Sequence, residues 1–198
     1  MSLFIESIRV EHGEVPHIDF HQARIQRTWQ SCGLAHEPLQ LEKLLPAALP
    51  DERHKWRLVY SEEGLVSQTL EPYVFRLIDS LKIVYCDNID YACKFADRSI
   101  LERLYAQRGA AQDILIVKNG LLTDTSIANI ALSNGDIWYT PRTPLLKGTK
   151  REELLYYGFL EEADLTVEDL RRFAYIRLLN AMVDFEEWSF PTSNILFR

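Results

Sequence analysis

The sequence predicts a protein of the α+β class. Helix-like and strand-like segments both occur, but they do not alternate regularly, as the segments of a doubly wound parallel sheet do. A glycine-rich phosphate loop of the Rossmann or P-loop type is also absent. With 198 residues and 47% hydrophobic residues, the chain can build one large domain or two small ones around a normal core.

The first part of the chain predicts a hairpin, two helices and a second hairpin. Residues 4–10 alternate and are rich in β-branched and aromatic types, which is typical of a strand. A turn at His12-Gly13 leads to a second short strand over 15–18. Asp19 is a candidate N-cap of the next helix, and Gly33 a candidate end. The other elements expected here are a helix over 39–49 and strands over 56–60 and 66–72, joined by a turn at Glu63-Gly64.

The second part predicts mainly strands joined by tight turns. Asn-Gly pairs at 119–120 and 134–135 each favour a hairpin turn. The other elements expected here are a strand over 77–85 and helices over 97–108, over 150–157 and in the acidic stretch 161–172. Residues 175–182 and 188–198 are ambiguous between strand and helix.

Composition excludes several classes of function. A formal net charge of −7 argues against a nucleic-acid partner, since phosphate backbones are bound by clustered Lys and Arg. The three cysteines form no CxxC pair, and the five histidines form no metal-binding motif, so reduced thiols and no metal site are expected. No apolar run is long enough to span a membrane and no secretory leader is apparent, which predicts a cytoplasmic protein.

Four places in the chain are candidates for chemistry, and each also has an ordinary structural explanation. Lys94 lies among apolar and aromatic neighbours, where its stem can cover apolar surface and its ammonium can stay in water. Asp124 lies in a Thr-Asp-Thr-Ser run that is typical of a turn. Arg24 can belong to a solvated helix face, and Gly148-Thr149 to an ordinary helix start.

Taken together, short motifs resemble the fold-type IV pyridoxal-phosphate enzymes, also called class IV aminotransferases. This group includes branched-chain and D-amino-acid aminotransferases and aminodeoxychorismate lyases. The motifs that carry the resemblance are, in chain order, IESIRVEHGEV, HQARI, KFADR, TDTSIANIAL followed by WYTP, and LLKGTKREELL. The resemblance implies a small first domain over about 1–76 and a second domain over about 80–198, with the cofactor, pyridoxal 5′-phosphate, lying between them.

The resemblance also implies a role for each candidate residue. Lys94 would carry the cofactor aldehyde and then act as general base and acid, because only lysine offers a primary amine. Asp124 stands where the family usually has a glutamate and would keep the pyridine nitrogen protonated. The phosphate would be held by Arg24 and by the backbone N–H groups of Thr149 and Lys150 at a helix start. The residues with the weakest match are Asn180, a phosphate-loop candidate, and Arg98 and Arg57, which are candidates for substrate binding.

The motifs leave the reaction itself open. Arg98 and the KFADR segment favour a lyase such as 4-amino-4-deoxychorismate lyase, but the Gly-Arg-Gly-Tyr loop of many lyase-like members is absent after the strand near Leu58. The alternatives are a branched-chain or D-amino-acid transaminase and a non-catalytic remnant that binds only the cofactor or an anion. The first domain looks shortened at its start, and a homodimer acting on a small amino-acid-like substrate is expected.

Overall fold

In the computed structural model, which describes residues 2–197, the chain divides into two compact units. The first comprises the residues up to Phe75 together with Cys93–Asp97, and the second comprises Arg76–Ala92 and the residues from Arg98 onward. That each unit folds as an independent domain, with the boundaries expected from the sequence, stays a prediction. Residues 2–197 form three α-helices, four short 3-10 helices and twelve strands, so the expected mixed α+β class is confirmed.

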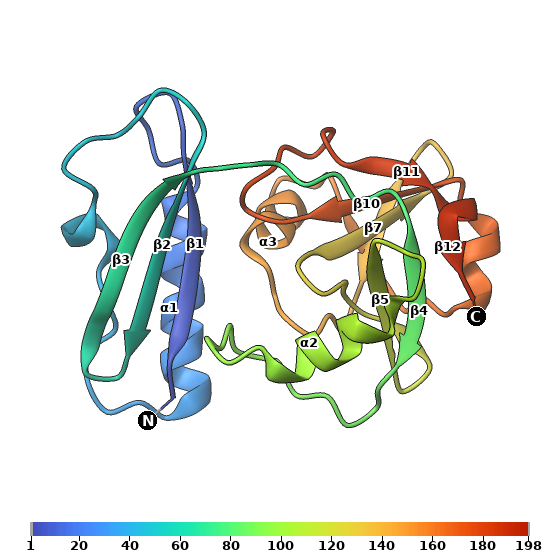
Figure 1. The fold of residues 1–198 in the computed structure, drawn as a ribbon, viewed down its shortest axis with the longest axis horizontal. Coiled ribbons are helices and arrows are strands. Elements are labelled where there is room, and N and C mark those ends of the chain that lie inside the picture. Colours follow the sequence, from blue (N-terminus) through green and yellow to red (C-terminus); the bar gives the residue numbers. More distant parts are fainter. Residues whose placement is uncertain (1, 198) are drawn as a thin grey trace. The chain divides into compact units, whose positions relative to one another are not determined.

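The first unit is an antiparallel sheet with one helix packed on it (Figure 1). Its strands, in the order β1-β2-β3, and its helices are β1 (Phe4–Val10), β2 (His54–Ser61), β3 (Gly64–Pro72), α1 (Ile18–Cys32) and the short 3-10 helix η1 (Leu41–Leu44). Alternate residues of β1 and β2 point to the helix, and Ile25 and Trp29 of α1 pack against them in one buried cluster. Each such side chain contributes about 1.5–3 kcal/mol by leaving water.

In this unit, local sequence patterns predicted the secondary structure correctly where no tertiary contact or proline competed with them. The strand over 4–10, the hairpin at Glu63-Gly64 and the helix end at Gly33, which has φ 61°, are confirmed. The expected strand over 15–18 is wrong, because only one bridge, Glu11 with Glu14, forms there. The expected helix over 39–49 is also wrong, because Pro46 cannot continue a helix and only η1 forms before it.

The start of α1 also differs from expectation. The helix begins at Ile18, and its N-cap is His17 in a left-handed conformation without a side-chain capping bond. Asp19 is therefore not the N-cap. It lies in the first turn instead, where its charge still interacts favourably with the positive end of the helix dipole.

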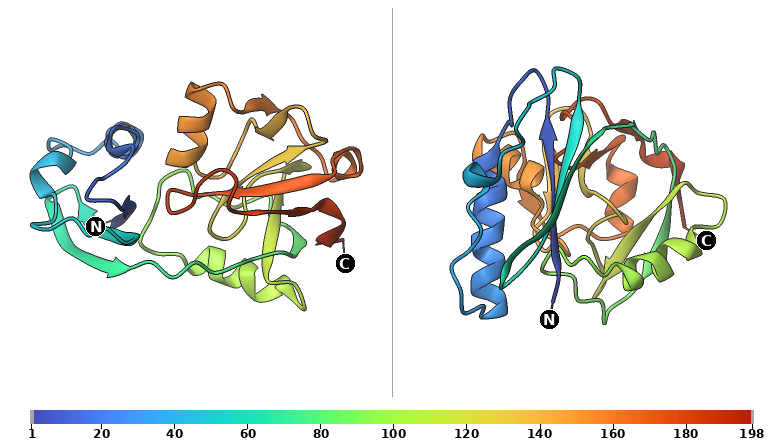
Figure 2. Two further views of the ribbon diagram at one scale, coloured as in Figure 1. Left: turned by 90° about the horizontal axis from the view of Figure 1, so that it is seen from above. Right: turned by 60° about the vertical axis from the view of Figure 1, so that its left-hand side comes forward.

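The second unit contains a five-stranded and a four-stranded sheet with α2 and α3 (Figures 1 and 2). The five-stranded sheet has the order β11-β10-β7-β8-β9, and its strands are β7 (Asn129–Ser133), β8 (Trp138–Pro141), β9 (Glu161–Ala163), β10 (Tyr175–Leu179) and β11 (Ser189–Pro191). The four-stranded sheet has the order β12-β4-β5-β6, and its strands are β4 (Leu81–Tyr85), β5 (Asp113–Lys118), β6 (Leu121–Leu122) and β12 (Ile195–Leu196). The helical segments are α2 (Ser99–Tyr105), η2 (Ala106–Arg108), α3 (Thr149–Tyr156), η3 (Glu168–Arg172) and η4 (Thr192–Asn194).

In this unit, turn residues predicted the secondary structure better than the composition of a segment did. Asn119 and Gly120 both have positive φ, 51° and 80°, as a type I′ hairpin turn requires. The acidic stretch 161–172 does not form the expected α-helix, because it begins as strand β9 and ends as η3. The ambiguous C-terminal segments form strands β10 to β12. Among the described residues, no helix is long and apolar enough to cross a membrane.

Candidate active site

Lys94 lies in a short segment that pairs with β1 inside the first unit. The carbonyl of Lys94 accepts a hydrogen bond from the N–H of Ile5 (2.9 Å), and the N–H of Ala96 donates to the carbonyl of Leu3 (2.8 Å). An antiparallel bridge joins Phe4 to Phe95. These contacts fix the backbone on both sides of Lys94, whose side chain is half-buried.

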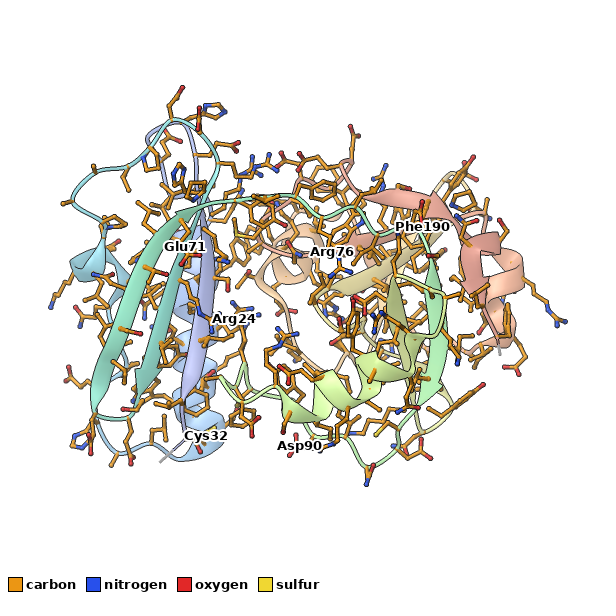
Figure 3. The ribbon with its side chains drawn as sticks, viewed as in Figure 1. Arg24, Cys32, Glu71, Arg76, Asp90 and Phe190 are labelled. Carbon is orange, nitrogen blue, oxygen red and sulfur yellow. The ribbon has the colours of Figure 1, made fainter. Side chains whose placement is uncertain are left out.

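Arg24 takes part in a buried cluster with Glu6 and His21, between α1 and the sheet. Its Nε donates to Glu6 Oε1 (2.9 Å), its Nη2 donates to Glu6 Oε2, and His21 Nδ1 lies 2.6 Å from the same oxygen. All three side chains are at least nine-tenths buried. The reading of Arg24 as part of a solvated helix face is therefore wrong (Figure 3).

The electrostatics of this cluster follow from its burial. Burial alone would raise the pKa of Glu6, but the Arg24 guanidinium and the His21 ring outweigh it and lower that pKa to about 2. Burial lowers the pKa of His21, and the positive charges of Arg24 and Lys94 act in the same direction. At neutral pH the cluster therefore holds a carboxylate, a guanidinium and a neutral imidazole.

Asp124 is the corresponding buried acid of the second unit. Its Oδ1 accepts a hydrogen bond from Asn129 Nδ2 (2.7 Å), and its Oδ2 accepts one from the N–H of Leu146 (2.9 Å). Burial raises the pKa of Asp124 to about 7, although the Leu146 and Asn129 donors lower it in part. The carboxyl group is therefore poised to gain or lose its proton near neutral pH.

Asn129 connects Asp124 to the loop that leads into α3. Besides Asp124, its Nδ2 donates to the carbonyl of Leu146 (2.8 Å), and its Oδ1 lies against Gly148. A Cβ built on Gly148 would stand 2.1 Å from that Oδ1, so any larger residue would collide with the amide. The φ of Gly148 is −69°, which every residue adopts, so glycine is required here for space alone.

Thr149 and Lys150 open α3 directly after Gly148, and both are buried. The first N–H groups of a helix have no acceptor within the helix, and the helix dipole favours an anion there. The Lys150 side chain is paired with Glu153 (Nζ–Oε2 2.9 Å). Asn129 thus brings together Asp124 and the start of α3, two parts of the predicted site.

The three weakest candidates have contacts of structural character. Arg98 Nη2 donates to the carbonyl of Ser126 (2.7 Å), two residues after Asp124, so this arginine supports the Asp124 loop. Arg57 is half-buried on β2, opposite Ser7 and Thr69 of the neighbouring strands. Asn180 follows β10, and its Oδ1 accepts a hydrogen bond from the N–H of Met182 (2.9 Å).

Sequence reasoning missed the residues that hold the candidates in place. Glu6 could have been found, because it occupies an inward position of an apolar strand and a carboxylate there needs a buried partner. His21 lies three residues before Arg24 on the same helix face, as the HQARI motif already indicated. The contact of Asn129 with Gly148 joins residues separated by the rest of β7, by β8 and by the loop before α3, and it has no local signal.

Comparison with known proteins places the chain in a family. The family of class IV amino-transferases matches residues 87–185. An uncharacterized protein of Haemophilus influenzae is 38% identical over 181 residues, which are 89% of this chain and 96% of that protein. A candidate 4-amino-4-deoxychorismate lyase of Haemophilus somnus, a crystal structure, is 31% identical and has a TM-score of 0.85 over 92% of this chain and 97% of its own.

A more distant structure has the same fold. It is the pyridoxal-phosphate-bound form of a hypothetical aminotransferase of Mycobacterium tuberculosis, which is 17% identical and has a TM-score of 0.74. The match covers 91% of this chain and 78% of that one. Because the family match covers half of the chain, the chain belongs to the class IV amino-transferase family.

Proposed function

We propose that the protein is a pyridoxal-phosphate-dependent enzyme whose cofactor is carried on Lys94, and that it acts as a 4-amino-4-deoxychorismate lyase. The observation that carries the cofactor proposal is the buried cluster formed by Asp124, Asn129 and the start of α3. The lyase proposal is supported by the name of the Haemophilus somnus relative.

The donor set of the chain fits this cofactor. An aldehyde needs a primary amine, a pyridine nitrogen needs an acid of matched pKa, and a phosphate needs N–H donors and a positive charge. The chain offers these in Lys94, Asp124, the helix start at Thr149 and Arg24.

When bound, the cofactor supplies an electron-accepting ring that stabilises negative charge on the substrate carbon. Lys94 Nζ would hold the cofactor, and as a free amine it would take the proton from the substrate carbon and return a proton later. Its backbone is hydrogen-bonded to the chain at β1 on both sides of the residue, which positions the amine.

Asp124 would hold a proton at the ring nitrogen, because its negative charge favours the protonated form of a neighbouring base. Burial raises the pKa of Asp124 to about 7, so the ionised carboxylate is available at and above neutral pH. Asn129 orients the carboxylate by donating to Oδ1, and the N–H of Leu146 orients the other oxygen. Aspartate therefore serves where the family usually has the longer glutamate.

Arg24 and the N–H groups of Thr149 and Lys150 bind the phosphate in this proposal. Glu6 fixes the Arg24 guanidinium through two hydrogen bonds, so little side-chain entropy is lost when an anion binds. Asn180 is proposed as a further phosphate contact, and Arg98 and Arg57 as contacts to an amino-acid-like substrate.

An assay of products tests the proposed reaction. We expect the cofactor-loaded protein to convert 4-amino-4-deoxychorismate to p-aminobenzoate and pyruvate, and we propose that it does so as a homodimer. Exchange of amino groups between amino acids and 2-oxo acids, without p-aminobenzoate, would assign a transaminase instead. Binding of the cofactor without either reaction would assign a non-catalytic remnant of the fold. Sedimentation of the active protein as a monomer would contradict the dimer.

A further inference from the structure

We propose that Cys32 and Cys93 form a reversible disulfide site beside Lys94, one that reacts with low-molecular-weight disulfides. The two Sγ atoms lie 3.3 Å apart, although 61 positions separate the residues along the chain. Cys32 is the last residue of α1 (labelled in Figure 3), and Cys93 immediately precedes Lys94. Both belong to the first unit.

The two thiols differ in their access to solvent in the way such a reaction requires. Cys32 is exposed, so a dissolved oxidant can reach it. Cys93 is 7% exposed and belongs to the core cluster with Trp29 and Tyr60. The oxidant therefore meets Cys32 first, while Cys93 stays within reach of the Cys32 sulfur.

The chemistry balances as two thiol–disulfide exchanges. The Cys32 thiolate attacks an external disulfide RSSR, which gives a Cys32–S–SR bond and releases one RS⁻. The Cys93 thiolate then attacks the Cys32 sulfur, forms the Cys32–Cys93 bond and releases the second RS⁻. The two thiol protons pass to the released thiolates, so the protein loses two electrons and two protons and RSSR becomes two RSH. Excess RSH reverses both steps.

The bond would anchor the segment that carries Lys94. In the reduced protein, this segment is joined to β1 by backbone hydrogen bonds that include Ile5 N–H to Lys94 and Ala96 N–H to Leu3. A covalent link from Cys93 to the end of α1 restricts movement of the Lys94 segment away from β1. Opening would then have to break the strand pairing while the disulfide still holds one end of the segment. Only the importance of this restriction for a catalytic Lys94 rests on the proposed function.

A background that keeps only the two cysteines of the site isolates the reaction. The variant Cys86→Ser removes the third thiol and keeps a donor for its Asn88 partner. This protein is treated with oxidised glutathione, digested without reduction and mapped by mass spectrometry. Amide hydrogen exchange at Ile5 and Ala96 is measured before and after oxidation, with Cys32→Ser in the same background as control.

We expect a Cys32–Cys93 peptide, its loss with reduced glutathione, and exchange at Ile5 and Ala96 that is at least tenfold slower after oxidation, but not in the control. A glutathione adduct that persists on Cys32 while Cys93 stays reduced would overturn the site. A disulfide with unchanged exchange would overturn the anchoring. Cofactor attachment to Lys94, measured separately on the reduced protein, reports on the proposed function: its failure leaves the disulfide result standing, and its success does not rescue a missing disulfide.

Discussion

From the contact between Gly148 and Asn129 we predict that the cost of Gly148→Ala depends on whether residue 129 is asparagine. Alanine at position 148 places its Cβ 2.1 Å from Asn129 Oδ1, about 1 Å closer than two such atoms can approach. Asn129 must then move, which disturbs the hydrogen bonds that it donates to Asp124 and Leu146. The clash predicts coupling between the two positions.

The magnitudes follow from buried packing and hydrogen bonding. Overpacking of this kind costs about 1–3 kcal/mol. Without the Asn129 side chain the clash is absent, and two small effects of Gly148→Ala offset one another. The unfolded chain loses entropy, which stabilises by about 0.4–1 kcal/mol, while an alanine N-cap of α3 loses a similar amount. Asn129→Ala alone costs about 1–3 kcal/mol, because a buried carboxyl oxygen and a carbonyl lose their donor.

Urea unfolding followed by tryptophan fluorescence, to which buried Trp188 of the second unit contributes, measures the four proteins of this cycle. We expect Gly148→Ala to lower the free energy of unfolding by about 1–3 kcal/mol in the natural chain and by less than about 0.5 kcal/mol when Asn129 is alanine. Equal effects in both backgrounds would refute the reasoning, because the cost would then not come from Asn129.

Two further predictions concern the buried acids. Glu6→Gln should lower the free energy of unfolding by about 3–5 kcal/mol, because the buried charge of Arg24 loses its Glu6 counter-charge. It should also weaken binding of pyridoxal phosphate more than that of pyridoxal. Equal weakening, or the same result for exposed Glu14→Gln, would contradict a role through the phosphate. For Asp124, the folded protein holds its proton up to a pKa of about 7 and the unfolded chain only to its ordinary value of 3.8, so the free energy of unfolding should fall between about pH 4 and pH 7. That component should be missing in Asp124→Asn, and a pH profile identical to that of the natural chain would contradict it. Glu6 acts with the opposite sign: its pKa of about 2 lies below the ordinary 4.5, so its stabilisation is present above pH 4.5 and is lost as the pH falls towards 2.

Local chemistry determined which parts of the fold could be predicted from the sequence. Gly33 and the Asn119-Gly120 pair adopt conformations with positive φ that few other residues tolerate, so the helix end and the hairpin could be placed. The segment 39–49 is rich in leucine, but Pro46 prevents a continuous helix.

The supporting residues of the site depend on contacts between segments far apart in the sequence. Glu6 and Arg24 are brought together by the packing of α1 on β1, and Asn129 meets Gly148 only after the second unit has folded. The motifs around Lys94 and Asp124 predicted which residues to consider. They contained no indication that Asp124 would be held by Asn129 and Leu146.

The most direct test of the central proposal is to incubate the protein with pyridoxal phosphate, reduce it with borohydride and map the modified peptide. We predict a visible absorption band that borohydride bleaches and one modified residue, Lys94, with both lost in Lys94→Ala, while matched substitution of the half-buried Lys118 leaves them intact. No band, or modification scattered over surface lysines, would contradict a cofactor carried on Lys94.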